Sequence, residues 1–320
     1  MAISFVPVVI QTVASKSWSA TPPSWAEVDV SAYVPADANG VVCIYTGNTG
    51  TAVGFHLRQK GSTDNRSGRA SGRRQLGVIC GIDANKKFEY LTYDNCTIRL
   101  IGYTLPDGVT HFANGVDVSP VAGAWTDVDL SVLCPGAIGI ILECYVDGAG
   151  LNHEIGARMK GSTDNNTQDS YGHNCYSFVV GCDGSQVIQL HREDNTVTWY
   201  VTGYIINGCF FFTNAEDYTP AVLSTEEVKV LKDQYGTLYA SMGFFEITDG
   251  ASLSIRRQGE TQPTNVGVGG SSAHQGYFAN ASDIKRRMLI YTEGAATKFY
   301  LLGYALGGKT SGKLLSRRIF

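Results

Sequence analysis

One polar hexapeptide offers the clearest chemistry in the sequence. Lys-Gly-Ser-Thr-Asp-Asn occupies residues 60–65 and recurs without change at residues 160–165. Its serine, threonine and acidic residues form turns on their own, because Gly tolerates a positive φ and the polar side chains bond to nearby backbone. A structural turn is therefore favoured over a calcium site, which needs more oxygens, or a site that hydrogen-bonds a sugar. The candidate ligands for that second role are Asp64, Asn65, Asp164 and Asn165.

A basic segment follows the first hexapeptide. Its four arginines are spaced by Gly, Ser and Ala, whereas residues 166–174 contain no Lys or Arg. Such a segment predicts a mobile cationic finger for an acidic protein surface, a phosphorylated glycan or nucleic acid, with an ordinary solvated loop as the alternative. Residues 309–320 form a second basic segment, typical of a docking arm. The candidate partner-binding arginines are Arg66, Arg69, Arg73, Arg74, Arg317 and Arg318.

A third group of arginines precedes the hexapeptide. Arg58, Arg158 and Arg256 each end an alternating segment. A guanidinium could clamp a carboxylate ligand. Since Arg256 persists where the hexapeptide is replaced by Glu-Thr-Gln-Pro at residues 260–263, we expect these arginines to bind a carboxylate or loop carbonyls within their own domain.

Catalysis, cofactor binding and metal binding find little support. The six histidines show no metal-binding spacing, no Gly-x-Ser-x-Gly motif is present, and residues 307–314 miss the phosphate-binding pattern because no Ser or Thr follows Lys313. The eight cysteines form no Cys-x-x-Cys pair. The sequence therefore predicts a protein that is not an enzyme, has no cofactor or metal, and carries buried free thiols.

These residues belong to a repeat of about 100 residues. Trp25 maps onto Trp125, and residues 28–31 map onto residues 128–131. A closing Gly-Tyr pair ends each copy, at Tyr103, Tyr204 and Tyr304. The third copy has diverged, and residues 224–227 alone resemble a helix-capping box. Because three copies should share one fold, we expect a strand there.

Strand signals within each copy are clear. Residues 25–30 and 125–130 alternate between apolar and polar side chains, while residues 41–45 and 138–144 are short apolar runs typical of central strands. About seven short strands per copy, separated by Gly, Asn and Asp, indicate a two-sheet sandwich. The predicted fold is all-β, with three tandem β-sandwiches of jelly-roll type.

Domain boundaries follow from the repeat. The predicted units are residues 1–105, 106–206 and 207–308, with a basic tail at 309–320. The segments between closing and opening motifs carry apolar runs, so we expect them to pack as added strands. Residues 3–13 are expected to form such a strand for the first copy, or to add to a partner's sheet edge.

Composition argues against several classes of protein. Hydrophobic residues make up 43% of the 320 and charged residues 17%, so the chain can build sizeable cores. A net charge of −4 argues against general nucleic-acid or anionic-membrane binding. No apolar run reaches about 18 residues, and the N-terminal segment lacks a basic region, so neither a membrane span nor a secretory signal is predicted.

Tandem sandwiches with Gly-, Tyr- and Asn-rich loops and no enzyme motif resemble the structural proteins of tailed bacteriophage particles. The resemblance implies a capsid decoration, collar, baseplate or fibre-associated protein, made in the host cytoplasm and located in the virion in multiple copies or as a homo-oligomer. Other virion proteins would be its partners, which it would bridge. The alternative is a carbohydrate-binding adhesin or host-receptor-binding module, in which Trp18, Trp25, Tyr171 and Tyr176 grip a surface glycan.

Overall fold

Antiparallel strands account for all the regular secondary structure that the computed structural model describes. No helix suited in length and hydrophobicity to crossing a membrane occurs in the described part of the chain. The described residues are 5–17, 24–47, 52–66, 68–71, 74–92, 95–147, 152–171, 175–230, 239–248, 253–257, 278–281, 287–292, 295 and 297–307.

The first sandwich contains two four-stranded sheets, with orders β1-β8-β3-β6 and β2-β7-β4-β5. This is the strand order of an eight-stranded jelly roll, built from two Greek keys. Its strands are β1 (Phe5–Lys16), β2 (Ala26–Asp29), β3 (Gly40–Gly47), β4 (Ala52–Gln59), β5 (Gly68–Ser71), β6 (Arg74–Gly81), β7 (Lys87–Thr92) and β8 (Cys96–Thr104).

The second sandwich repeats this order in the sheets β9-β16-β11-β14 and β10-β15-β12-β13. Its first strand, β9, lies in the apolar segment between the first closing motif and the next copy, where an added strand was expected. The strands are β9 (Val109–Asp117), β10 (Thr126–Asp129), β11 (Gly139–Val146), β12 (Asn152–Met159), β13 (Gln168–Tyr171), β14 (Cys175–Gly181), β15 (Val187–Arg192) and β16 (Val197–Ile205).

The third sandwich has the sheets β17-β23-β19-β21 and β18-β22-β20. Its β18 confirms the strand that was expected where local sequence resembles a helix cap. The strands are β17 (Cys209–Asp217), β18 (Glu227–Val230), β19 (Tyr239–Thr248), β20 (Leu253–Arg257), β21 (Phe278–Ala281), β22 (Arg287–Thr292) and β23 (Lys298–Gly307). The all-β jelly-roll prediction is therefore confirmed.

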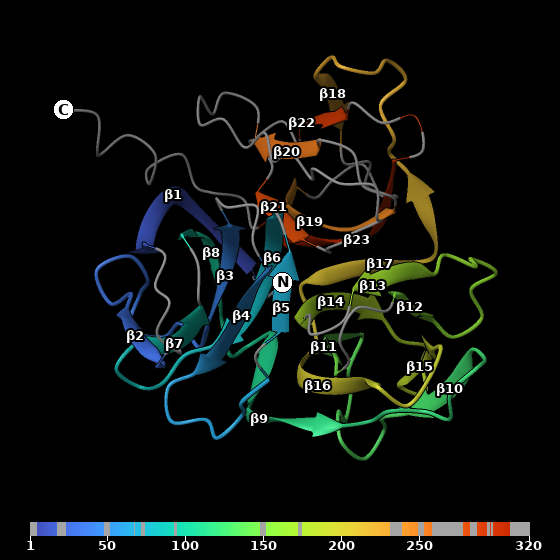
Figure 1. Cartoon of the computed structure of the whole chain (residues 1–320), viewed down its shortest axis with the longest axis horizontal. Helices are drawn as coiled ribbons and strands as arrows, with labels where there is room; N and C mark the ends of the chain where they lie inside the picture. The colour runs from blue at the N-terminus through green and yellow to red at the C-terminus, as the bar shows by residue number, and fades with distance from the viewer. Residues whose placement is uncertain are drawn as a thin grey trace.

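The three sandwiches lie as three lobes around a common centre, where their four-stranded inner sheets meet (Figure 1). One apolar cluster fills this centre and draws residues from all three lobes. They include Phe5, Val42, Ile79, Val109, Ile141, Val179, Phe211, Met242 and Phe244. A shared core of this kind joins the sandwiches into one body, because burying apolar surface between them is favourable.

Central strands are apolar throughout because both of their faces are buried. On β3, Val41 and Cys43 face the core of their own sandwich, while Val42 and Ile44 face the common centre. In the second sandwich, β11 places Ile141 at the centre. Its next residue with the same orientation is Glu143, which is also buried. A charged group therefore lies where the first sandwich has an isoleucine.

Candidate functional site between the first and second sandwiches

The hexapeptide loop binds the sandwich that follows it. Gly61, at φ 88°, turns the chain after β4, and the Asp64 N–H donates to Ser62 Oγ at 3.1 Å. Ser62 Oγ and the Thr63 N–H then donate to Asn114 Oδ1 on β9, each at 2.8 Å. Asp64 Oδ2 accepts the Gly115 N–H at 2.7 Å. We call this set of bonds the clasp.

A second clasp joins the second and third sandwiches through the same atoms. Ser162 Oγ and the Thr163 N–H donate to Asn214 Oδ1, at 3.0 and 2.8 Å. Asp164 Oδ2 accepts the Ala215 N–H at 2.6 Å. The repeated loop is thus both the turn predicted from its sequence and an inter-sandwich contact that the sequence reasoning missed. The signal was present, since Asn114 and Asn214 are themselves 100 residues apart.

Beside each clasp, an aromatic ring enters a socket formed by two paired glycines. Gly40 and Gly81 are opposite each other in β3 and β6, and any Cβ on them would collide with the His111 ring or its Cβ at 2.3 and 2.9 Å. In the second interface, Gly139 and Gly181 accommodate Phe211 in the same way. Burial lowers the pKa of His111 to about 4, and its Nε2 lies 2.9 Å from Thr104 Oγ1. The neutral imidazole therefore fills the position that Phe211 fills in the next interface.

Arginines behind the loops act as the sequence predicted. Arg58 Nε donates to Glu89 at 2.8 Å, Nη1 donates to the Asp64 carbonyl, and the guanidinium covers the Trp25 ring at 3.7 Å. Arg158 repeats the arrangement with Gln189, the Asp164 carbonyl and Trp125. These contacts lie within each sandwich and confirm the expected structural role. The side chain of Arg256 lies outside the described residues.

Arg66 crosses from the first sandwich into the second. Its Nε and Nη2 donate to the two carboxylate oxygens of Glu143 at 3.0 and 3.2 Å, and Nη2 also donates to Asp64 at 2.7 Å. Its guanidinium lies 4.0 Å from the centre of the Tyr200 ring. Arg66 and Glu143 are each only 8% exposed. A buried, two-pronged ion pair therefore spans the interface.

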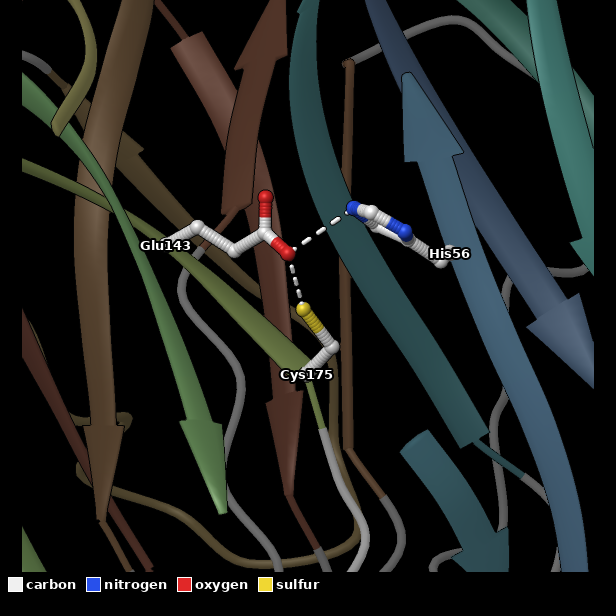
Figure 2. A group of neighbouring side chains, drawn as sticks. All are labelled: His56, Glu143 and Cys175. Carbon is white, nitrogen blue, oxygen red and sulfur yellow. Dashed lines mark hydrogen bonds and ion pairs between the residues drawn. The ribbon is translucent and has the colours of Figure 1, made fainter. Parts of the chain in front are cut away.

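Two further polar side chains reach the same carboxylate. His56 Nε2 on β4 lies 2.9 Å from Glu143 Oε1, and Cys175 Sγ on β14 donates to that oxygen at 2.5 Å. Figure 2 shows His56 and Cys175 approaching Glu143 from different strands. These groups border a pocket, which Arg66 and Asp64 also line.

Electrostatics favour an ionised Glu143 and a protonated Cys175. Burial opposes ionisation of Glu143, but His56 and Arg66 outweigh it and hold the pKa of this carboxyl well below its ordinary value. Burial, together with the nearby Glu143 charge, raises the pKa of the Cys175 thiol. Nucleophilic cysteines need a depressed pKa. Cys175 is therefore a hydrogen-bond donor here and is not an activated nucleophile.

The structure places the predicted partner-binding residues in different environments. Asp64 and Asp164 are engaged in the clasps, and Asn165 Oδ1 accepts the Trp125 Nε1–H at 2.9 Å. Asn65 is exposed. The prediction of a mobile arginine finger is wrong for Arg66, because two carboxylates bury it. The backbone at Arg69 and Arg74 lies in β5 and β6, and the partner-binding role of these two arginines stays a prediction. The side chains of Arg69 and Arg74, and all of Arg73, Arg317 and Arg318, lie outside the described residues.

All eight cysteines are free, as the sequence predicted, and every one but Cys175 is buried. Of the adhesin's candidate aromatics, Tyr176 is 1% exposed and Trp25 is covered by Arg58. Trp18 and the side chain of Tyr171 lie outside the described residues.

No family model and no curated protein matches the chain. Among solved structures, the chain is similar to one from the atomic structure of Sulfolobus Turreted Icosahedral Virus, at 10% identity and a TM-score of 0.25, covering 95% of this chain and 91% of that one. Another, from a study of the triple jelly roll fold and turret assembly in an archaeal virus, shows 10% identity and a TM-score of 0.23 over the same shares of the two chains.

Proposed function

We propose that this chain is a structural component of a virus particle. The observation that supports the proposal is the shared apolar centre, through which three jelly rolls form one body. Clasps made from the chain's most distinctive motif hold two of its junctions. Polar groups that could have bound a ligand or activated a substrate are thus used to fix sandwiches in place. What the molecule offers to partners is a single body of three joined jelly rolls.

Within that role, we propose a bridging component such as a capsid decoration, collar, baseplate or fibre-associated protein of a tailed phage. Three linked lobes can touch several neighbours at once, so individually weak contacts add up to firm attachment. The chain would be present in multiple copies on the particle, with other virion proteins as partners.

Particle purification tests the proposal. Particles from a culture that encodes the chain are banded on a density gradient, and protein ratios across the band are measured by quantitative mass spectrometry. We expect the chain to follow the major capsid protein at a fixed stoichiometry after a high-salt wash. Recovery of the chain only at the top of the gradient would contradict a virion role.

A glycan array distinguishes the adhesin alternative from the proposed structural role. The isolated chain should show no saturable glycan binding if its role is to join particle proteins. Asp164→Ala is an unsuitable probe, because this carboxylate holds the second clasp. Asn65→Ala is better suited, since Asn65 is an exposed residue of the same loop. Saturable binding that Asn65→Ala abolishes would replace the structural proposal with receptor binding.

A further inference from the structure

Three side chains of different chemistry converge at the first interface. His56 comes from β4, Glu143 from β11 and Cys175 from β14, and one nitrogen, one oxygen and one sulfur atom all lie within 4.8 Å of one another. His56 is 3% exposed and Glu143 8%. A mixed N, O and S donor set at this spacing is the kind that holds Zn²⁺ and related transition ions.

The imidazole supplies an independent observation. Nε2 of His56 lies 2.9 Å from Glu143 Oε1, which is an ion-pair distance for a protonated imidazole, but the contact is not a hydrogen bond. Neither ring nitrogen has a hydrogen-bond partner among the described residues. A buried polar group left in this state is costly. A metal ion bound to the Nε2 lone pair would remove that cost.

We propose that His56, Glu143 and Cys175 bind a divalent transition ion, Zn²⁺ above all, which cross-links the first sandwich to the second. Ligands around a tetrahedral zinc, at the usual bond lengths, are about 3.3–3.6 Å apart. The contacts in the cluster are 2.9 Å for His56 and 2.5 Å for Cys175 to Glu143 Oε1. The site forms when these two contacts open by about 1 Å or less and the His56 nitrogen and Cys175 sulfur, which lie within 4.8 Å, settle about 3.6 Å apart.

Charge balance is maintained when the ion binds. The Cys175 thiol releases one proton to solvent as its sulfur bonds to the metal, because a coordinating thiol is deprotonated. His56 binds as the neutral imidazole, so a proton that pairs Nε2 with Glu143 also leaves to solvent. The thiolate and the Glu143 carboxylate then offset the two positive charges of the ion. The bond of Arg66 Nε to Oε1, at 3.0 Å, is given up to the ion, while Nη2 keeps its bonds to Glu143 Oε2 and to Asp64, so the guanidinium still has anionic partners on both sides. The cysteine sulfur disfavours Mg²⁺ and Ca²⁺.

Sequence reasoning predicted no metal because the three donors are far apart in the chain and show no ligand spacing. The second interface lacks the set. In the aligned registers, Gly156 stands where His56 does, and Asn166 follows the second loop where Arg66 follows the first. The acidic position recurs in the third sandwich, as Glu246. The proposed ion would thus be specific to one junction.

Metal titration of the full-length chain tests the inference. Protein purified with a thiol reductant and freed of metal is titrated with Co²⁺, and then with Zn²⁺ in competition. We expect one equivalent to bind with a thiolate-to-cobalt absorption band, and Zn²⁺ to displace it. Cys175→Ser should abolish the band and weaken binding at least about ten-fold, while His56→Gln should also weaken it about ten-fold or more.

Cys182→Ser is the matched control, because the Cys182 thiol donates to the Ala137 carbonyl and lies away from the cluster. It should leave the band and the affinity unchanged. Circular dichroism and the metal-free thermal midpoint of each variant confirm folding. Absence of saturable Co²⁺ binding, or a band that survives in folded Cys175→Ser, would overturn the inference and leave a hydrogen-bonded cluster. The proposed virion role does not depend on either result.

Discussion

The two clasped interfaces share one set of positioning bonds and differ in what they bury. Both dock a Ser-Thr-Asp loop onto an asparagine of the next strand, and both set a ring between paired glycines. At the first interface, the remaining space holds a buried ion pair between Arg66 and Glu143. Asn166 follows the second loop at the matching place. Duplication therefore retained the contacts that fix geometry and changed the charges beside them.

Contacts between the third and first sandwiches follow a different plan. There β1 contacts β19 and β23, while β6 and β8 contact β21. Pro7 stands in β1 at the register position that His111 and Phe211 occupy in β9 and β17. The sequence also has Glu-Thr-Gln-Pro at residues 260–263 in place of the hexapeptide's polar residues. At this junction, both the polar loop motif and the aromatic ring of the clasped interfaces are thus replaced by other residues.

Removing Arg66 should have the largest effect. Arg66→Ala leaves Glu143 buried without its guanidinium partner, and breaking such a pair costs about 3–5 kcal/mol. Chemical denaturation gives the free energy of unfolding. Asn166→Ala is the matched control at the second interface and should cost less than about 1 kcal/mol. Equal losses of unfolding free energy in the two variants would show that the two interfaces do not differ in this respect.

Acidity should weaken the first interface through His111. Its pKa is about 4 in the folded chain against an ordinary 6.5, so the unfolded state binds the proton more readily. The stability that the neutral His111 contributes to the folded chain is fully present above pH 6.5 and is lost as the pH falls towards 4. The total loss is about 3 kcal/mol. His111→Phe, which installs the ring found at position 211, should flatten this part of the stability profile. A parallel profile for the variant would show that His111 is not responsible.

Filling a glycine socket should disturb the second interface. A Cβ at Gly181 would lie 2.3 Å from Met159 Cε and 2.5 Å from Phe211 Cβ, so Gly181→Ala should cost about 1–3 kcal/mol. Gly184→Ala is the control, since nothing lies within 4 Å of its Cβ position. Thermal unfolding of both variants measures the difference. A neutral Gly181→Ala would mean that the ring moves aside freely.

Breaking a clasp should have the smallest effect, and the same one at both interfaces. Asn114→Ala and Asn214→Ala each remove one oxygen that accepts three hydrogen bonds at a surface, a loss worth about 1 kcal/mol. The double variant should lose the sum, because the two sites share no partner. Urea denaturation of all three proteins checks this. Unequal single losses would indicate that the clasps are not equivalent.

The fold was largely predictable from the sequence. The repeat aligned three copies, and alternation or apolar runs located strands such as β3 and β11. The copies also outweighed a local helix signal at residues 224–227, since β18 begins at Glu227. Strand order could not be derived, because spacing along the chain does not determine which strands pair.

The site was less predictable, for a physical reason. Asp64 and Asp164 were singled out, but their partners on β9 and β17 are contacts between sandwiches, and patterns within one copy do not report these. Arg66 was read as exposed because Gly and Ser surround it. Its burial depends on Glu143, which is 77 residues away and whose charge stands in an otherwise apolar run. Convergence of distant residues is a property of the packed fold.

Each clasp joins a loop to the strand that begins shortly after the same sandwich closes. During synthesis, β9 leaves the ribosome soon after β8 completes the first jelly roll. Asn114 can therefore form its clasp with the finished first sandwich before the rest of the second sandwich has been translated. The second clasp can form at β17 by the same order of events. Domains made in this sequence fold from the N-terminus onwards. The junction between the last lobe and the first, where the sequence has no hexapeptide, then forms last, when the whole chain has emerged.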